Sequence, residues 1–496
     1  MCLKNHFRQY GVPVPVLILC LALGMLLAAD SFPSPPAIQI EVDPRVELMS
    51  IVFRLAGNLE YRQGLVASYA KDVDEYFAKF RDHPAVEMAR RLRENAGIVL
   101  DAPMALAVHV TDVFSLEERV PLAPRPPELD FRWTPDSARG FLAALRSFVK
   151  DVDFKGFLES HQNIYRTAVE RLSAVLNGQK IRAWFDGFFG SRPNLDFIVV
   201  LGLLNGNSSY GPSIRLPAGR GEIYSILGVS TVDNAGLPKF GPSVVATIIH
   251  EFNHAYVNPL IEAHKAELET AAKKIFRQVA GDMRKQAYGS WEPMMYESLV
   301  RACCVRYTLA SNGPEAAVQE VKHNRNRRFL WTGELANLLG DYEKQRDRYP
   351  TLDSFFSKIT AFFTEYSRNI ETEVAAFKEE KRQQMEDLKA KSPKIVSLVP
   401  ANEASDVDPR LKSIVVTFDR PMKPGYIAVI RLDANRFPKI TDQVSFDAKQ
   451  TVLTIPVELE PNREYVLGFN AEEILLMQDE QGNPLAPVVI RFKTRK

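Results

Sequence analysis

VVATIIHEFNHAYV, residues 244–257, contains the pentad His250-Glu251-Phe252-Asn253-His254. Two residues four positions apart lie on the same face of an α-helix, because one turn takes about 3.6 residues. The imidazoles of His250 and His254 are therefore expected to hold one zinc ion together. Glu251, beside the first histidine, is expected to act as general base on a water bound to that metal.

The flanking residues predict where this helix begins and ends. Pro242 lies near the first helical position, where its missing N–H costs nothing. Asn258-Pro259 is expected to end the helix, because the residue before a proline avoids the α region. Apolar residues between these signals predict a buried face that holds the histidines in place, namely Val245, Ile248, Ile249, Phe252 and Tyr256.

A catalytic zinc usually takes three protein ligands and a water, so a third ligand is needed. The carboxylates that follow the pentad are Glu262, Glu267, Glu269, Glu292 and Glu297. We favour Glu297, because its helix is largely apolar and a buried carboxylate is costly unless it is paired or metal-bound. An ion pair with Arg301, four residues on, is the alternative, and the two interpretations are compatible, because a ligating carboxylate is commonly oriented by a partner that does not touch the metal. His264 follows the proline break and is not favoured.

Peptide hydrolysis also needs a group that stabilises the oxyanion. The sequence leaves several candidates open: Tyr210, Tyr256, Tyr296, Arg301, Arg306 and Tyr307. Of these, we retain Arg301, Tyr256 and Tyr307, either as residues that orient a metal ligand or as residues that stabilise the oxyanion. The strand expected at residues 222–229 is predicted to offer an edge to which an extended substrate adds.

The composition is that of a folded globular protein, with 46% hydrophobic and 25% charged residues among 496. A chain of this length is expected to form two or three domains. The net charge of +1 gives no overall field that would attract nucleic acid, so no nucleic-acid partner is expected.

The N-terminus has the pattern of a secretory signal peptide, predicted to span residues 1–29. Lys4 and Arg8 precede an apolar run from Val16 to Ala29. Export to the periplasm or the extracellular space is expected, and an uncleaved membrane anchor is the alternative. Cleavage would leave Cys303 and Cys304, which are adjacent and cannot easily bridge, so we interpret them as buried apolar residues.

The predicted fold class is α+β with a C-terminal all-β domain. Residues 30–45 are expected to be an extended lead-in, and helical periodicity begins at Val46. Two β-rich runs, 196–204 and 222–229, predict a small sheet within a mainly helical domain over 46–366. A charged helical linker over 367–393 is predicted to lead to a β-sandwich over 394–496, where short strands alternate with turn residues.

Three motifs resemble those of the bacterial DUF4932 family, over roughly residues 45–365. They are VELMSIVFRLAG at Val46 to Gly57, HEFNHAYVNP at His250 to Pro259, and YESLVRA at Tyr296 to Ala302. The resemblance implies a zincin-like metallopeptidase of the gluzincin type, with His250, His254 and Glu297 as zinc ligands and Glu251 as catalytic base.

Residues 394–496 resemble a bacterial Ig-like domain. The motifs are PANEASDV at Pro400 to Val407, VTFDRPM at Val416 to Met422 and DEQGNPL at Asp479 to Leu485. Domains of this kind are spacers or binding modules, so the resemblance implies a possible partner in the cell envelope or outside the cell.

The expected function is that of a zinc-dependent peptidase with one Zn²⁺ per chain and a protein or peptide substrate. A first alternative is a non-enzymatic surface protein whose zinc is structural, with Cys303 or Cys304 supplying a fourth ligand. A second alternative keeps the chemistry but changes the bond cleaved, to a cell-wall peptide or another amide.

Overall fold

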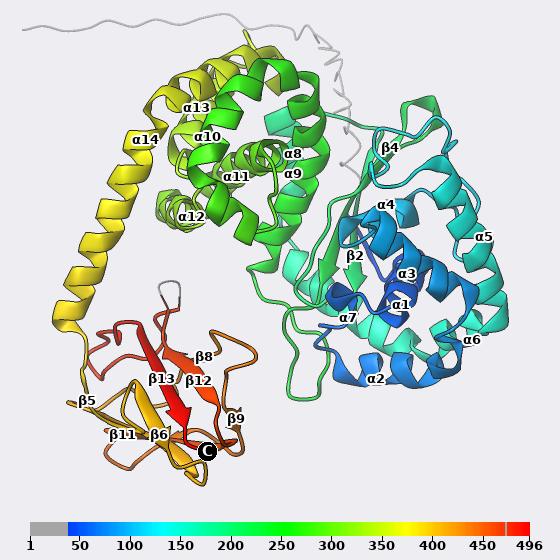
Figure 1. Cartoon of the computed structure of the whole chain (residues 1–496). Coiled ribbons are helices and arrows are strands. Elements are labelled where there is room, and N and C mark those ends of the chain that lie inside the picture. Colours follow the sequence, from blue (N-terminus) through cyan, green and yellow to red (C-terminus); the bar gives the residue numbers. More distant parts are fainter. Residues whose placement is uncertain (1–37, 472–473) are drawn as a thin grey trace, which may run out of the picture. The chain divides into compact units, whose positions relative to one another are not determined.

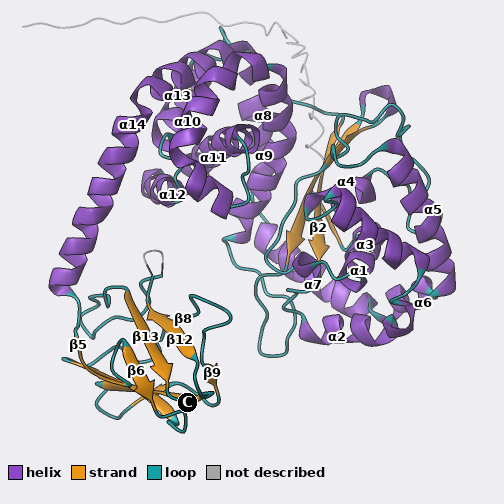
Figure 2. Ribbon diagram, viewed as in Figure 1, coloured by secondary structure: helices purple, strands orange, loops and turns teal. Residues whose placement is uncertain are grey.

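The computed structural model describes residues 38–471 and 474–496, so the predicted signal peptide lies outside the described residues. About half of the described residues are helical, and the C-terminal region is rich in strands (Figure 1; Figure 2). Of the described residues, those up to Gly241 form one compact unit, and those from Pro242 onward form a second. The residues predicted to form one domain, 46–366, are thus divided between the two units. Over the described ranges, no helix combines the length and apolar character needed to cross a bilayer.

The first unit packs helices around a small sheet. Its helices are α1 (Pro44–Leu55), α2 (Ala67–Tyr76), α3 (Pro84–Ala96), α4 (Asp101–Val108), α5 (Pro135–Asp151), α6 (Phe154–Ser160), α7 (Gln162–Leu176) and α8 (Ile181–Phe189). Short 3₁₀ turns occur at Leu59–Tyr61, Ala78–Phe80 and Pro217–Gly219. Prolines begin α1, α3 and α5, because the first helical N–H has no partner within the helix.

The sheet of the first unit has the order β1-β2-β4-β3, from β1 (Gln39–Glu41), β2 (Leu195–Gly202), β3 (Ser213–Arg215) and β4 (Gly221–Gly228). β1 and β4 run parallel to β2, and β3 runs antiparallel to β4. The two predicted β-rich runs are β2 and β4. β1 lies within the predicted lead-in. It pairs with β2 through main-chain hydrogen bonds, and three residues are too few to show the side-chain pattern that predicts a strand.

The expectation that residues 222–229 form a free edge is wrong. β4 pairs along its whole length with β2. Its other side is occupied by β3 and by a bridge between Tyr210 and Ile226, because the chain between β2 and β4 folds back against it. The glycines at both ends of β4 serve this packing: a Cβ on Gly228 would come within 2.3 Å of the Gly206 carbonyl oxygen.

The second unit begins with helices α9 (Val244–Ala263), α10 (Lys265–Lys285), α11 (Trp291–Asn312), α12 (Pro314–Asn326), α13 (Thr332–Lys344) and α14 (Leu352–Lys391). The prediction that Pro259 ends the motif helix is wrong, since α9 continues for four residues beyond it. Val257 and Ile261 are buried on either side of Pro259, so tertiary packing keeps the helix intact despite the missing N–H.

α14 is one continuous helix, and it runs across the predicted boundary at residue 366. The Thr351 side chain caps its start by accepting a hydrogen bond from the Ser354 N–H. Ile370 and Phe377 are buried and continue the apolar face of the helix past that boundary.

The C-terminal strands form two sheets that enclose an apolar core. The first contains β10-β11-β7-β5 with β9 also paired to β11, and the second has the order β6-β13-β12-β8. The strands are β5 (Ile395–Val399), β6 (Ala404–Val407), β7 (Ser413–Phe418), β8 (Val429–Ile430), β9 (Lys439–Ile440), β10 (Ser445–Phe446), β11 (Val452–Glu458), β12 (Glu464–Phe469) and β13 (Val488–Thr494). Ile414, Ile455 and Leu467 are fully buried between the sheets, and burial alternates along β7 and β11.

Candidate metal centre

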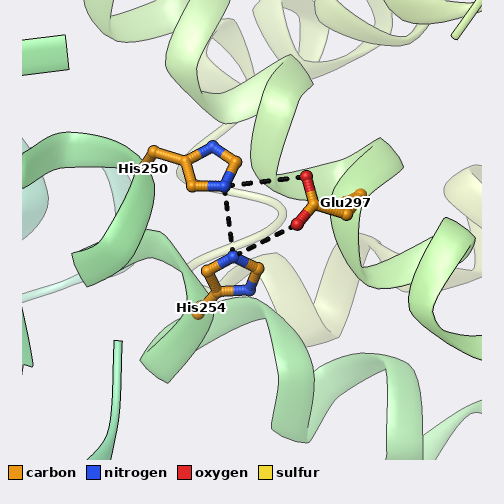
Figure 3. A group of neighbouring side chains, drawn as sticks. All are labelled: His250, His254 and Glu297. Carbon is orange, nitrogen blue, oxygen red and sulfur yellow. Dashed lines mark hydrogen bonds and ion pairs between the residues drawn. The ribbon is translucent and has the colours of Figure 1, made fainter. Parts of the chain in front are cut away.

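Two packed helices of the second unit carry the candidate ligands. α9 presents His250 and His254 one turn apart, and α11 presents Glu297 (Figure 3). Ile249 and Phe252 anchor α9 in the core, and Met294 and Val300 do the same for α11. The packing of these apolar faces fixes the distance between the imidazoles and the carboxylate.

The three side chains converge on one point. The two Nε2 atoms of His250 and His254 are 3.2 Å apart. His250 Nε2 lies 3.6 Å from Glu297 Oε2, and His254 Nε2 lies 3.5 Å from Glu297 Oε1. A tetrahedral zinc with bonds of about 2.0–2.2 Å has ligand atoms about 3.3–3.6 Å apart. The separations in the protein therefore fit a zinc ion, and within the described residues these three side chains form a group that could hold a metal.

The hydrogen bonds around the histidines also suit a metal. His254 Nδ1 lies 3.2 Å from Oδ1 of Asn258, one turn further along α9. An amide oxygen only accepts, so Nδ1 donates its proton to Asn258 and Nε2 is the ring nitrogen that faces Glu297. Asn258 is thus a site residue that our sequence reasoning treated only as a helix end, although its spacing of four from His254 was visible.

Positively charged side chains surround the Glu297 carboxylate and favour its ionised form. Burial acts to raise the pKa of Glu297, but His250 and Arg301 outweigh it and hold the pKa well below its usual range. Burial also acts to lower the pKa of His254, and the charge and hydrogen bond of Glu297 reverse this, raising it to about 9. The carboxylate therefore stays ionised and attracts a cation, whether a proton on histidine or a metal ion.

Glu251 follows His250 on α9 and is 7% exposed. Its negative charge is among the groups that raise the pKa of His254, which places it close to the ligand cluster. A carboxylate at this position lies beside the ligands without being one of them, as a general base requires.

The residues predicted as candidates for stabilising the oxyanion differ in their partners and their burial. Arg301 Nη2 forms an ion pair with Glu297 Oε2 at 2.7 Å, as the spacing of four predicts. The hydroxyl of Tyr296 donates to Glu262, and Arg306 pairs with Glu343. Two further candidates in the second unit are buried, Tyr256 at 2% and Tyr307 at 4% exposure, while Tyr210 belongs to the sheet of the first unit.

The disfavoured ligands lie elsewhere. His264 contacts Glu267 at 3.0 Å and Asp353 at 2.8 Å, and it is not part of the ligand cluster. Cys303 and Cys304 are buried free thiols, in agreement with their interpretation as apolar residues. Burial raises the pKa of both thiols, so both stay protonated.

One further residue near the cluster left no signal in the sequence. Asn324, on α12, accepts a hydrogen bond at 2.8 Å from Nη1 of Arg301. It lies 27 positions after Glu297 on another helix (324 − 297), and a periodicity argument within one helix does not reach so far.

Comparisons with known proteins identify both regions. Residues 130–362 match the model of a domain of unknown function, DUF4932, and residues 389–494 match that of a bacterial Ig-like domain. The first match contains all three candidate ligands, and it leaves the motif at Val46 to Gly57 outside. Among curated proteins, no match to the chain was found.

Two solved structures are similar to parts of the chain. CopC from Methylosinus trichosporium OB3b is 16% identical, with 21% of this chain and 93% of that chain covered and a TM-score of 0.16. The S-layer protein rSbsC(31-844) is 14% identical, with 50% of this chain and 34% of that chain covered and a TM-score of 0.16. At these TM-scores neither likeness carries an argument. The family matches do carry one: the chain contains a DUF4932 domain followed by a bacterial Ig-like domain.

Proposed function

We propose that this chain is an exported zinc-dependent peptidase with a zincin-like site of the gluzincin arrangement. The observation that carries the proposal is the convergence of His250, His254 and Glu297, with nitrogen and oxygen atoms 3.2 to 3.6 Å apart. His₂Glu is a ligand set of catalytic zinc, and it leaves a position for water or substrate.

In the proposed reaction, the bound zinc supplies Lewis acidity, which polarises a carbonyl and lowers the pKa of water toward about 7. Glu251 accepts a proton from the attacking water while the oxygen of that water bonds to the carbonyl carbon of the peptide. Glu251 then gives that proton to the amide nitrogen as the C–N bond breaks. Arg301 keeps Glu297 ionised and oriented throughout, because the two side chains are paired and buried.

The alternative of a structural zinc has less support. A structural site is closed by four protein ligands, and the group found in the described residues has three. The protonated thiols of Cys303 and Cys304 are not members of it. The geometry therefore favours an open, catalytic site over a closed one.

We further propose that the protein acts in the periplasm or outside the cell, on proteins or peptides. The support for export is the pattern of Lys4, Arg8 and the apolar run from Val16 to Ala29. The Ig-like domain is proposed to bind a partner in the cell envelope or in the extracellular space.

The test compares four forms of the mature protein in metal analysis and in hydrolysis of a fluorescently labelled unstructured protein. Glu251→Gln should retain about one zinc per chain and lose hydrolysis, since removing a general base costs about 10²–10⁴-fold. His250→Ala should lose zinc and activity together. Glu269→Gln, an exposed glutamate on α10, is the matched control and should match the unaltered protein. Full activity in Glu251→Gln would refute the proposal.

A further inference from the structure

Arg301 is held on four sides by groups from separate segments. Nη2 pairs with Glu297 Oε2 at 2.7 Å and donates to the hydroxyl of Tyr288 at 3.3 Å. Nη1 donates to Asn324 Oδ1 at 2.8 Å, and the guanidinium carbon lies 4.5 Å from the ring centroid of Phe329. Arg301 is 5% exposed, so water does not replace these contacts. The direction of the guanidinium is therefore set by its neighbours.

Asn324 is the neighbour whose own orientation is fixed. It is fully buried, and its Nδ2 donates to the carbonyl oxygen of Glu320 at 2.9 Å and to Glu320 Oε1 at 3.0 Å. The opposite orientation of the amide would place its NH₂ group against the guanidinium, donor against donor. Glu320, Asn324 and Arg301 therefore form a chain of hydrogen bonds, and the ion pair of Arg301 connects this chain to the Glu297 carboxylate.

We propose that Asn324 is a positioning residue of the metal site, acting through Arg301 on the carboxylate of Glu297. This inference rests on the proposed metal site but not on the reaction performed there. Partners in the outer shell of a metal ligand typically change metal affinity by about 10–100-fold when they are removed. Asn324 lies on α12, which packs against α11, and α11 packs in turn against α9. Asn324 therefore acts on the third ligand from outside the helix pair that carries the ligands.

The test measures Co²⁺ and Zn²⁺ binding by the full mature chain, with the visible absorption of Co²⁺ as a report of ligand geometry. Asn324→Leu keeps the branched shape of the side chain but removes the acceptor for Arg301, and we expect metal affinity to fall about 10–100-fold with a changed Co²⁺ spectrum. The double variant Asn324→Asp with Glu320→Gln restores an acceptor toward Arg301 and lets the amide of residue 320 donate to the second carboxylate oxygen, while the main-chain carbonyl of residue 320 loses its donor. It should recover part of the affinity and shift the spectrum back toward that of the unaltered protein. Asn326→Leu, on the same helix, is the control and should change neither.

Each outcome decides the question. Tight binding and an unchanged spectrum in Asn324→Leu would overturn the inference. Equal loss in Asn324→Leu and in the double variant would also overturn it, because the loss would then reflect damage to the fold rather than the missing acceptor. An unaltered protein that binds neither metal would sink the proposed metal site itself, whereas one that binds metal without cleaving peptides would sink only the peptidase activity.

Discussion

Replacing Glu297 by glutamine tests how the site is built, without reference to any metal. The change keeps the size of the side chain and removes its charge. Arg301, 5% exposed, would then lose the carboxylate that lies 2.7 Å from its Nη2. Its remaining contacts, with Asn324, Tyr288 and Phe329, carry no negative charge. A buried guanidinium would be left without a counter-ion.

Removing one partner of a buried ion pair costs roughly 3–5 kcal/mol in the free energy of unfolding. For a unit the size of Pro242–Lys496, each kcal/mol lowers the melting temperature by about 2–4 °C. We therefore expect Glu297→Gln to lower the melting temperature of the metal-free second unit by about 6–20 °C. Thermal unfolding followed by circular dichroism and calorimetry, at pH 7 with a chelator present, measures this shift.

A double-mutant cycle separates the ion pair from general damage to the core. Arg301→Met removes the cation instead, and the double variant removes both charges. Because an apolar replacement of a whole buried pair is often nearly neutral, the double variant should be more stable than Glu297→Gln alone. Strictly additive effects of the two substitutions, or a shift below about 2 °C in Glu297→Gln, would refute the reasoning.

Three further predictions concern other parts of the chain. Burial raises the pKa of Glu47 from 4.5 to about 7, so its contribution to stability is complete below about 4.5 and is lost as the pH rises through 7. Urea titrations of the first unit should show a pH-dependent loss of roughly 3 kcal/mol that Glu47→Gln diminishes, and an equal slope in both proteins would contradict this. Pro259→Ala should raise the melting temperature, with a gain of up to about 3 kcal/mol, because it restores an N–H within α9; a lower melting temperature would count against a continuous helix. Ile455→Ala should destabilise the β-sandwich by about 2–5 kcal/mol in denaturant titrations while the zinc content stays the same. A change in zinc content would contradict the expectation that the metal site does not depend on the sandwich core.

The local patterns of the sequence were sufficient for several parts of the structure. A spacing of four placed His250 and His254 on one face of α9, and the same spacing joined Glu297 to Arg301. The short strands separated by turn residues were enough to predict the sandwich, and the period of two in β7 and β11 matches their buried faces. In each case the interacting residues lie within one element, or the pattern of one element determines which of its faces is buried.

Tertiary packing decided the rest. The continuation of α9 through Pro259 depends on the burial of Val257 and Ile261, which outweighs the local cost of the proline. The interior position of β4 depends on the chain that folds back beside it, and main-chain pairing leaves no periodic trace in either partner. The approach of Glu297 to the two histidines, and of Asn324 to Arg301, depends on how α9, α11 and α12 pack. Sequence alone therefore determined which residues could ligate a metal, and only the packing of α9 against α11 brought their atoms to the separations that a metal requires.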